Sequence, residues 1–227
     1  MENAKRPINT ETPKPYSPPP MRLYRFAVGL LSAPLRFLMT DVRGTENMPE
    51  QGACFVCANH ISNWDPVLVA IAVKRPVHFM AKVQLFRVPL LGKLLRTLGA
   101  FPVDRDAADI GAIKTALTHI KHEEPLGIFP QGKRYRGERP QTKDIKNGVG
   151  MMVYRTHAPV VPVAIYTKEY KVRLFRRVHV RVGKPIEFEE FQAGAKSQEE
   201  YQRISDCIFD RICALDESAK AAKGENA

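Results

Sequence analysis

The sequence predicts a single α/β domain built around a mostly parallel sheet that is flanked by helices. Short β-branched runs alternate with segments of helical spacing, an order that is typical of this class. The length of 227 residues suits one domain. The composition, with 44% hydrophobic and 26% charged residues, is that of an ordinary globular protein. We expect an N-terminal amphipathic helix on a membrane surface to precede this domain.

The two ends of the chain are expected to be tails. Residues 1–20 contain six prolines among polar residues, a composition that predicts disorder. This stretch lacks the basic start, apolar centre and cleavage site of a secretory signal, so we expect a cytosolic protein. Residues 217–227 form a second polar, flexible tail. The domain itself is therefore expected to span residues 40–216.

The segment 21–39 predicts an amphipathic helix in the membrane interface. Its polar residues recur every three or four positions and draw one narrow stripe, formed by Arg22, Arg25, Gly29, Ser32 and Arg36. The uncharged run 26–35 is shorter than the roughly 20 residues that a membrane span needs, and arginine is costly at mid-bilayer. We favour an interfacial helix over one packed on the domain's own core or one that spans. The protein is then peripheral or monotopic, on the cytoplasmic face of the cell membrane.

The elements of the domain follow in order. Apolar, β-branched runs predict strands at residues 53–58, 77–81, 101–103, 126–129 and 160–166. Helical spacing predicts helices at residues 66–73, 89–98, 109–122 and 147–156. Within 171–182, valines alternate with basic residues, which predicts a half-buried antiparallel strand. A last helix is expected over 197–215.

The net charge of the chain indicates which classes of binding partner to expect. The net charge of +11 favours an anionic partner, such as nucleic acid, an anionic bilayer or a phosphorylated substrate. The sequence contains no zinc-finger spacing, RNP-like aromatic block or basic zipper, so we expect no nucleic-acid partner.

The pair Cys54 and Cys57 has the spacing of a metal or redox site, but it lies on a predicted buried strand. Residues three apart on a strand point to opposite faces and cannot share a metal ion. We therefore expect these cysteines to be core residues of a protein kept in a reducing cytosol.

The segment Asn59-His-Ile-Ser-Asn-Trp-Asp-Pro66 lies where a buried strand ends and a helix begins, an edge that holds active sites in α/β sheets. Asp65 is expected to be the N-cap of this helix, with Pro66 at its first position. The loop can bring the Asp65 carboxylate onto His60, leaving the other ring nitrogen to take a proton from a bound hydroxyl. The spacing alone also arises by chance, and capping the helix is an adequate structural role for Asp65.

Several blocks together resemble the lysophosphatidic acid acyltransferase family of PlsC-like glycerolipid acyltransferases. The first family motif, N-H-x-x-x-x-D, is matched at Asn59, His60 and Asp65. The later blocks, in the family's order, are A-K-V-Q-L-F at 81–86, Asp104-Arg105, F-P-Q-G-K-R at 129–134 and V-P-V at 161–163. The resemblance covers about residues 40–185.

This resemblance implies transfer of a fatty acyl group from acyl-CoA or acyl carrier protein to lysophosphatidate, giving phosphatidate. It implies catalysis by His60 and Asp65 and no cofactor or metal ion. Arg105, Arg134 and Lys82 are expected to bind the substrate phosphate. The remaining motif positions are Asn59, Gln131, Gly132 and Pro162. A tunnel lined by residues such as Phe86 and Leu90 is expected to set the acyl-chain length.

Departures from the family pattern keep alternatives open. Gln84 and Gln131 stand where the family has acidic residues, and Lys133 replaces a threonine. Glutamine keeps an acceptor oxygen but loses the charge. The acceptor is then lysophosphatidate, another lysophospholipid or a lyso-aminolipid, and a non-catalytic lipid-binding accessory protein is a further alternative.

A phosphate-binding loop is a rival interpretation of the third block, because Gly127, Gly132 and Lys133 nearly match its spacing. Arg134 stands where a serine or threonine must bind magnesium, and Pro130 has no amide hydrogen to offer a phosphate. An NTPase is therefore disfavoured.

Overall fold

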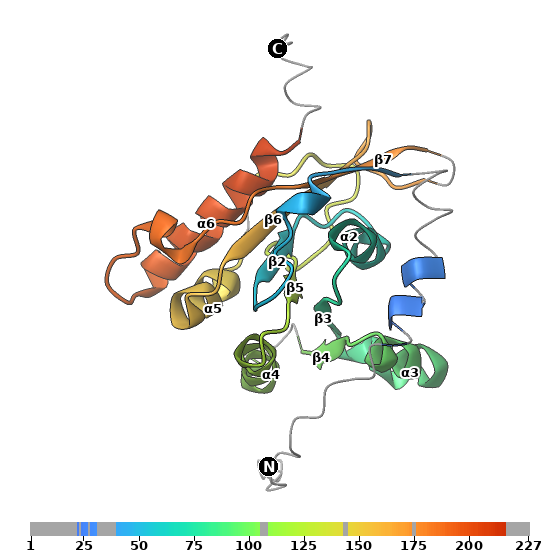
Figure 1. Cartoon of the computed structure of the whole chain (residues 1–227), viewed down its shortest axis with the longest axis horizontal. Coiled ribbons are helices and arrows are strands. Elements are labelled where there is room, and N and C mark those ends of the chain that lie inside the picture. The colour runs from blue at the N-terminus through green and yellow to red at the C-terminus, as the bar shows by residue number, and fades with distance from the viewer. Residues whose placement is uncertain are drawn as a thin grey trace, which may run out of the picture.

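The computed structural model describes residues 22, 24–26, 28–30, 40–104, 109–142, 145–173 and 176–216. A seven-stranded sheet runs through it, with the strands in the order β1-β7-β6-β2-β5-β3-β4 and helices on both faces (Figure 1). Strands β6, β2, β5, β3 and β4 are parallel to one another. The predicted fold class, one α/β domain with a mostly parallel sheet, is confirmed.

Most strands lie within two residues of the predicted positions. The strands of the sheet are β1 (Thr40–Arg43), β2 (Phe55–Ala58), β3 (His78–Lys82), β4 (Phe101–Val103), β5 (Leu126–Ile128), β6 (Val160–Tyr166) and β7 (Val178–Val182). Strand β1, which is four residues long and pairs in parallel with β7, was not predicted from the sequence. Strand β7 pairs antiparallel with β6, as predicted.

The helices also follow the predicted pattern. They are α2 (Asp65–Val73), α3 (Pro89–Thr97), α4 (Ile110–Lys121), α5 (Gly148–Thr156) and α6 (Gln198–Ala214). Three short 3₁₀ helices were not predicted: η1 (Thr45–Asn47), η2 (Val83–Arg87) and η3 (Phe188–Phe191). Such single turns carry too few residues to show a helical period.

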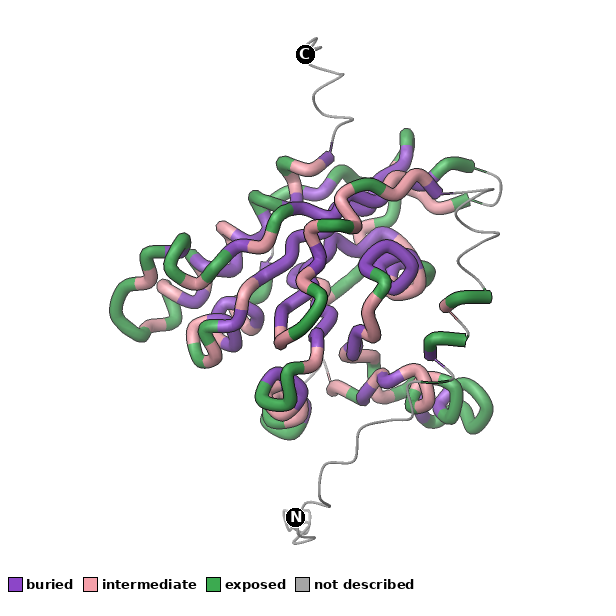
Figure 2. Tube along the Cα trace, in the orientation of Figure 1, coloured by how far each residue is buried: buried purple, intermediate pink, exposed green. Residues whose placement is uncertain are grey.

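The core is divided by the sheet into two layers (Figure 2). Residues of α4, α5 and α6 pack on one face, and those of α2 pack on the other. Cys57 belongs to the first layer and Cys54 to the second, and both are free and buried. Burial raises the pKa of the Cys54 thiol to about 11. The cysteines are therefore core residues on opposite faces, as predicted.

Strand β7 is buried more deeply than the half-buried strand that the sequence predicted. Arg181, on its polar side, is only 5% exposed because β1 covers it. Its Nη2 lies 2.8 Å from Oδ2 of Asp41 on that neighbouring strand. The unpredicted strand β1 thus explains the difference.

The N-terminal segment is helical at residues 22, 24–26 and 28–30, and the rest of 21–39 lies outside the described residues. Tyr24 is buried, and its hydroxyl accepts a hydrogen bond from the backbone N–H of Val77 at 3.3 Å. Phe26 and Leu30 are each 65% exposed. One side of this helix therefore packs on the domain while apolar side chains remain exposed. Among the described helices, none is long and apolar enough to cross a membrane.

The predicted tails, residues 1–20 and 217–227, lie outside the described residues, as does Arg105.

Candidate active site

Asn59 fixes the start of the loop that leaves β2. Its side chain is fully buried and bonds twice to the backbone of Ile165 on β6: Nδ2 donates to the carbonyl, and Oδ1 accepts from the N–H, both at 2.7 Å. A buried amide with both ends satisfied holds one conformation. This family-motif residue therefore anchors the segment that carries His60.

Asp65 holds the loop from the other end. One of its carboxylate oxygens, Oδ2, lies 2.6 Å from Nδ1 of His60 and accepts from the backbone N–H groups of Ile61 and Ser62 at 2.6 and 2.7 Å. The prediction that Asp65 caps α2 is wrong, because Trp64 is the N-cap and Asp65 is the first helical residue. The carboxylate turns back toward the preceding loop instead, since three donors converge on it there.

The second oxygen of Asp65, Oδ1, is buried and has no hydrogen-bond partner among the described residues. A buried acceptor left in this state costs about 1 to 3 kcal/mol. Unsatisfied groups of this kind are rare in folded proteins and call for an explanation, of which a catalytic role is one.

The tautomer of His60 follows from its partner. A carboxylate oxygen accepts, so the hydrogen of the neutral ring lies on Nδ1 and the lone pair lies on Nε2. The ring also stacks on Phe129, with the centroids 4.1 Å apart. His60 is only 6% exposed, so its orientation is fixed by packing as well as by Asp65. The arrangement presents one basic nitrogen, Nε2, in a defined direction.

The loop after β5 encloses His60. The side chain of Gln131 is buried, and its Oε1 accepts from the backbone N–H of His60 at 2.8 Å. The N–H of Tyr135 donates to the carbonyl of His60, also at 2.8 Å. A glutamine amide supplies the acceptor that a carboxylate would supply, without the charge. Gln131 is therefore a positioning residue, and its departure from the family pattern leaves this contact in place.

Gly132 allows this loop to turn, because its φ of +67° is one that side chains disfavour. The turn leads back toward the His60 loop and not into a helix, since the next helix, α5, begins only at Gly148. Gly127 lies inside β5, where an added Cβ would come within 2.2 Å of the Phe79 ring. A phosphate loop needs a helix directly after its glycines, so the NTPase interpretation is wrong.

The remaining predicted site residues differ in how close they lie to the pair. The Nη1 of Arg134 donates to the side-chain oxygen of Asn63, which places this exposed guanidinium on the His60–Asp65 loop. Lys82 is exposed at the carboxyl end of β3. Pro162 lies inside β6, paired with Cys57 of β2, and its carbonyl accepts from Gly183. Gln84 is exposed in η2 and is not part of the loop packing around His60.

A cavity of about 660 Å³ opens beside the loop after β5. Phe129, whose ring stacks on His60, belongs to its wall. The remaining lining combines apolar side chains with two lysines and two aspartates and includes Met80, Ile113, Val149, Met152, Lys133, Lys146, Asp104 and Asp109. The expected tunnel wall at Leu90 is wrong, because this side chain is 83% exposed on α3. The lining of this cavity comes from β3, β4, α4, α5 and β5 with the loop after it, which no local pattern in the sequence connects.

Comparison with known proteins gives a consistent result. Residues 39–166 match the family model described as acyltransferase. A 1-acyl-sn-glycerol-3-phosphate acyltransferase of Bacillus subtilis is 28% identical over 199 residues, covering 86% of this chain and 97% of the relative. An enzyme of the same name from Streptococcus pneumoniae is 29% identical, covering 78% of this chain and 66% of the relative. The crystal structure of the lysophosphatidate acyltransferase PlsC from Thermotoga maritima superposes with a TM-score of 0.64 at 26% identity, covering 88% of this chain and 80% of that one.

Proposed function

Because the chain belongs to the acyltransferase family, we propose that it moves a fatty acyl group from an acyl thioester to the free hydroxyl of lysophosphatidate, giving phosphatidate. The observation that carries this proposal is the buried His60–Asp65 pair, with its 2.6 Å contact and its defined basic nitrogen. The names of the relatives supply the acceptor, and the basic residues around the pair are consistent with it.

The proposed reaction is a direct transfer. The Nε2 of His60 takes the proton of the glycerol hydroxyl while the hydroxyl oxygen attacks the thioester carbonyl carbon. The C–S bond then breaks, and the imidazolium returns the proton to the leaving thiolate. Asp65 stabilises the imidazolium through its bond to Nδ1. General-base assistance of this kind contributes about 100- to 10,000-fold to the rate.

The acceptor phosphate is proposed to bind Arg134, with Lys82 and Arg105 as further ligands. Arg134 is supported by its contact with Asn63, which lies between His60 and Asp65 in the chain. A guanidinium binds phosphate oxygens through paired, charge-assisted hydrogen bonds. A phosphate held here fixes which hydroxyl reaches Nε2, which is an orientation effect.

The acyl donor is proposed to be acyl-CoA or acyl carrier protein, without a cofactor or catalytic metal ion. Both donors are acidic, and the net charge of +11 attracts them. The cavity beside Phe129 has apolar walls that suit an acyl chain, and its charged lining contains Lys133 and Lys146 as well as Asp104 and Asp109.

We place the protein on an anionic membrane, at its cytoplasmic face, as a peripheral or monotopic protein. Exposed apolar side chains gather on η2 and α3, at Leu85, Val88, Leu90, Leu91 and Leu94. Basic side chains lie among them at Arg87, Lys93 and Arg96. Apolar groups that enter the headgroup layer beside basic groups that attract anionic lipid describe an interfacial surface. Phe26 and Leu30 add exposed apolar area on the N-terminal helix.

The acceptor is tested with purified protein, a radiolabelled acyl-CoA and separate vesicles that carry lysophosphatidate, a neutral lysophospholipid or a lyso-aminolipid. The proposal expects labelled phosphatidate and at least tenfold lower turnover of the acceptors that lack a phosphomonoester. Faster acylation of another acceptor would replace lysophosphatidate as the substrate. Binding of lipid without any acyl transfer, from acyl-CoA or from acyl carrier protein, would favour the accessory-protein alternative.

A further inference from the structure

A second cluster of titratable side chains lies at the opposite edge of the sheet from His60. His60 and Gln131 follow the carboxyl ends of the parallel strands β2 and β5. His78 is the first residue of β3, and Glu124 lies just before β5, so both sit at the amino ends of parallel strands. His119, in the last turn of α4, completes the cluster. This group takes no part in the proposed acyl transfer.

The three side chains are close enough to share one ligand. Oε2 of Glu124 lies 2.7 Å from Nδ1 of His119 and 3.5 Å from Nε2 of His78. The two imidazole rings stack with their centroids 4.1 Å apart and an angle of 20° between them. Among the described residues, one nitrogen or oxygen from each of the three lies within 4.8 Å of the other two. His78 and His119 are 1% and 5% exposed, so the geometry is held by packing.

The backbone sets the tautomer of His78. Its Nδ1 lies 2.9 Å from the carbonyl oxygen of Gly99, which only accepts, so the hydrogen of the neutral ring is on Nδ1. The lone pair of Nε2 then faces the Glu124 carboxylate, an arrangement in which two acceptors oppose each other. A cation between them would turn this repulsion into two favourable bonds. Histidines that bind metal ions are oriented in this way, with the other ring nitrogen donating to a backbone carbonyl.

We propose that His78, His119 and Glu124 form a binding site for a divalent transition-metal ion, with zinc the best match. Two imidazole nitrogens and one carboxylate oxygen are a donor set that zinc binds, at about 2.0 to 2.2 Å from each atom. Tetrahedral bonds of that length separate the ligand atoms by about 3.4 Å. The observed separations of 2.7 and 3.5 Å need only small side-chain movements to reach this value.

The neutral form of His78, which metal binding requires, is favoured by its surroundings. Burial and the neighbouring His119 ring hold the pKa of His78 below its usual value. A metal ligand must be deprotonated, so this environment acts in the same direction as the geometry.

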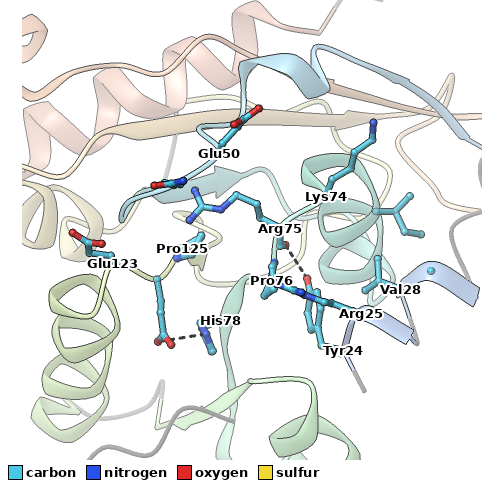
Figure 3. Close-up of a pocket in the computed structure, with 14 residues that line it drawn as sticks. Tyr24, Arg25, Val28, Glu50, Lys74, Arg75, Pro76, His78, Glu123 and Pro125 are labelled. Atoms are coloured by element: carbon cyan, nitrogen blue, oxygen red, sulfur yellow. Dashed lines mark hydrogen bonds and ion pairs between the residues drawn. The ribbon is translucent and has the colours of Figure 1, made fainter. Parts of the chain in front are cut away.

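A cavity of about 700 Å³ gives the site access to solvent. His78 and Glu124 belong to its lining, and the dashed line from His78 in Figure 3 marks their contact. Glu50 and Glu123 lie in the same cavity and offset the charge of Arg75 and Lys74. Three protein ligands leave a fourth position that water can occupy from this side. A bound ion would join β3, α4 and the segment before β5, and so stabilise the amino edge of the sheet.

The test uses the full chain after treatment with a chelator, titrated with zinc by calorimetry and followed by thermal unfolding. We expect one zinc ion per chain and a rise in Tm of about 5 to 10 °C at a hundredfold excess over Kd. The variants Glu124→Gln and His119→Gln should weaken binding by about 10- to 100-fold. His122→Gln is the matched control, because His122 lies at the same helix end but outside the cluster, and it should bind zinc like the wild type.

Cobalt supplies a second readout that does not depend on stability. Replacement of zinc by Co²⁺ should give visible absorption bands of a four-coordinate site in the wild type, and these should be lost in Glu124→Gln. Glu124 is partly exposed, so this variant is expected to fold, as circular dichroism can check. The proposal is overturned if the wild type shows no saturable binding, or if both ligand variants bind zinc as tightly as His122→Gln does.

Discussion

Two edges of one sheet each bury a histidine near a carboxylate, and they arrange the pair differently. At the carboxyl edge, Nδ1 of His60 donates to Asp65, so Nε2 is left for a substrate. At the amino edge, Nδ1 of His78 is opposite the carbonyl of Gly99, so Nε2 faces Glu124. The same two residue types are therefore proposed to act as a base in one place and as metal ligands in the other. Both rings are buried, and the group that accepts from Nδ1 differs: it is the Asp65 carboxylate in one place and the Gly99 carbonyl in the other.

The largest effect at the carboxyl edge is expected from Asp65→Asn. The substitution keeps the size but presents an amide to Nδ1 of His60, which favours the wrong tautomer. We expect kcat to fall by about 10,000-fold, with a smaller change in KM. Steady-state kinetics with lysophosphatidate measure it, and circular dichroism checks the fold. A loss below tenfold would mean that Asp65 serves only to hold the loop.

Arg134→Ala should act on acceptor binding. Loss of a charge-assisted hydrogen bond to phosphate, about 1.5 to 3 kcal/mol, corresponds to a rise of about 10- to 150-fold in the KM for lysophosphatidate. Arg134→Lys keeps the charge and should recover part of the loss. An unchanged KM in the alanine variant would remove Arg134 from the phosphate site.

Two variants of Gln131 test whether this residue acts by holding His60 in position. Gln131→Ala leaves the buried N–H of His60 without its acceptor, which should lower the free energy of unfolding by about 1 to 3 kcal/mol in a urea titration. Gln131→Glu, which restores the residue type usual in the family, keeps an acceptor and should preserve most of the activity. If the two variants lose the same activity, the contact with His60 does not explain this residue.

The smallest effect concerns the membrane surface. Leu90→Asp places a charge on the exposed apolar face of α3 and should weaken binding to anionic vesicles by about 3- to 10-fold in a flotation assay. Ile110→Asp is the matched control, because Ile110 is 65% exposed on a different helix, α4. Equal loss in both variants would show that η2 and α3 are not the docking surface.

The two edges of the sheet also differ in how far their side-chain contacts could be predicted from the sequence. His60 and Asp65 are five residues apart on one loop, so their contact follows from a strand end and a helix start. Glu124 likewise follows His119 by five residues, but His78 joins them only because β3 and β5 are neighbours in the sheet, and no spacing in the sequence records that. Strand β1 was missed for a similar reason, since its four residues gain their order from pairing with β7. Local chemistry was predictable, and contacts that depend on topology were not.

The wall of the cavity beside Phe129 also depends on topology and could not be predicted from local sequence. Its apolar residues come from β3, β4, α4, β5, α5 and the loop after β5, and those outside the F-P-Q-G-K-R block look like ordinary core residues in the sequence. Leu90 was expected to line a tunnel because it is apolar, yet apolar residues on a surface helix serve an interface equally well. Hydrophobicity alone does not distinguish a residue that lines a tunnel from one that forms an interface.

The central claim is that His60 is the base for acyl transfer to lysophosphatidate. Its most direct test is the rate of phosphatidate formation by purified His60→Ala under saturating acyl-CoA and lysophosphatidate, beside His122→Ala as a control that removes an exposed histidine. We predict a kcat at least 100-fold below that of the wild type for His60→Ala and an unchanged kcat for the control. A folded His60→Ala variant that forms phosphatidate at the wild-type rate would contradict the mechanism.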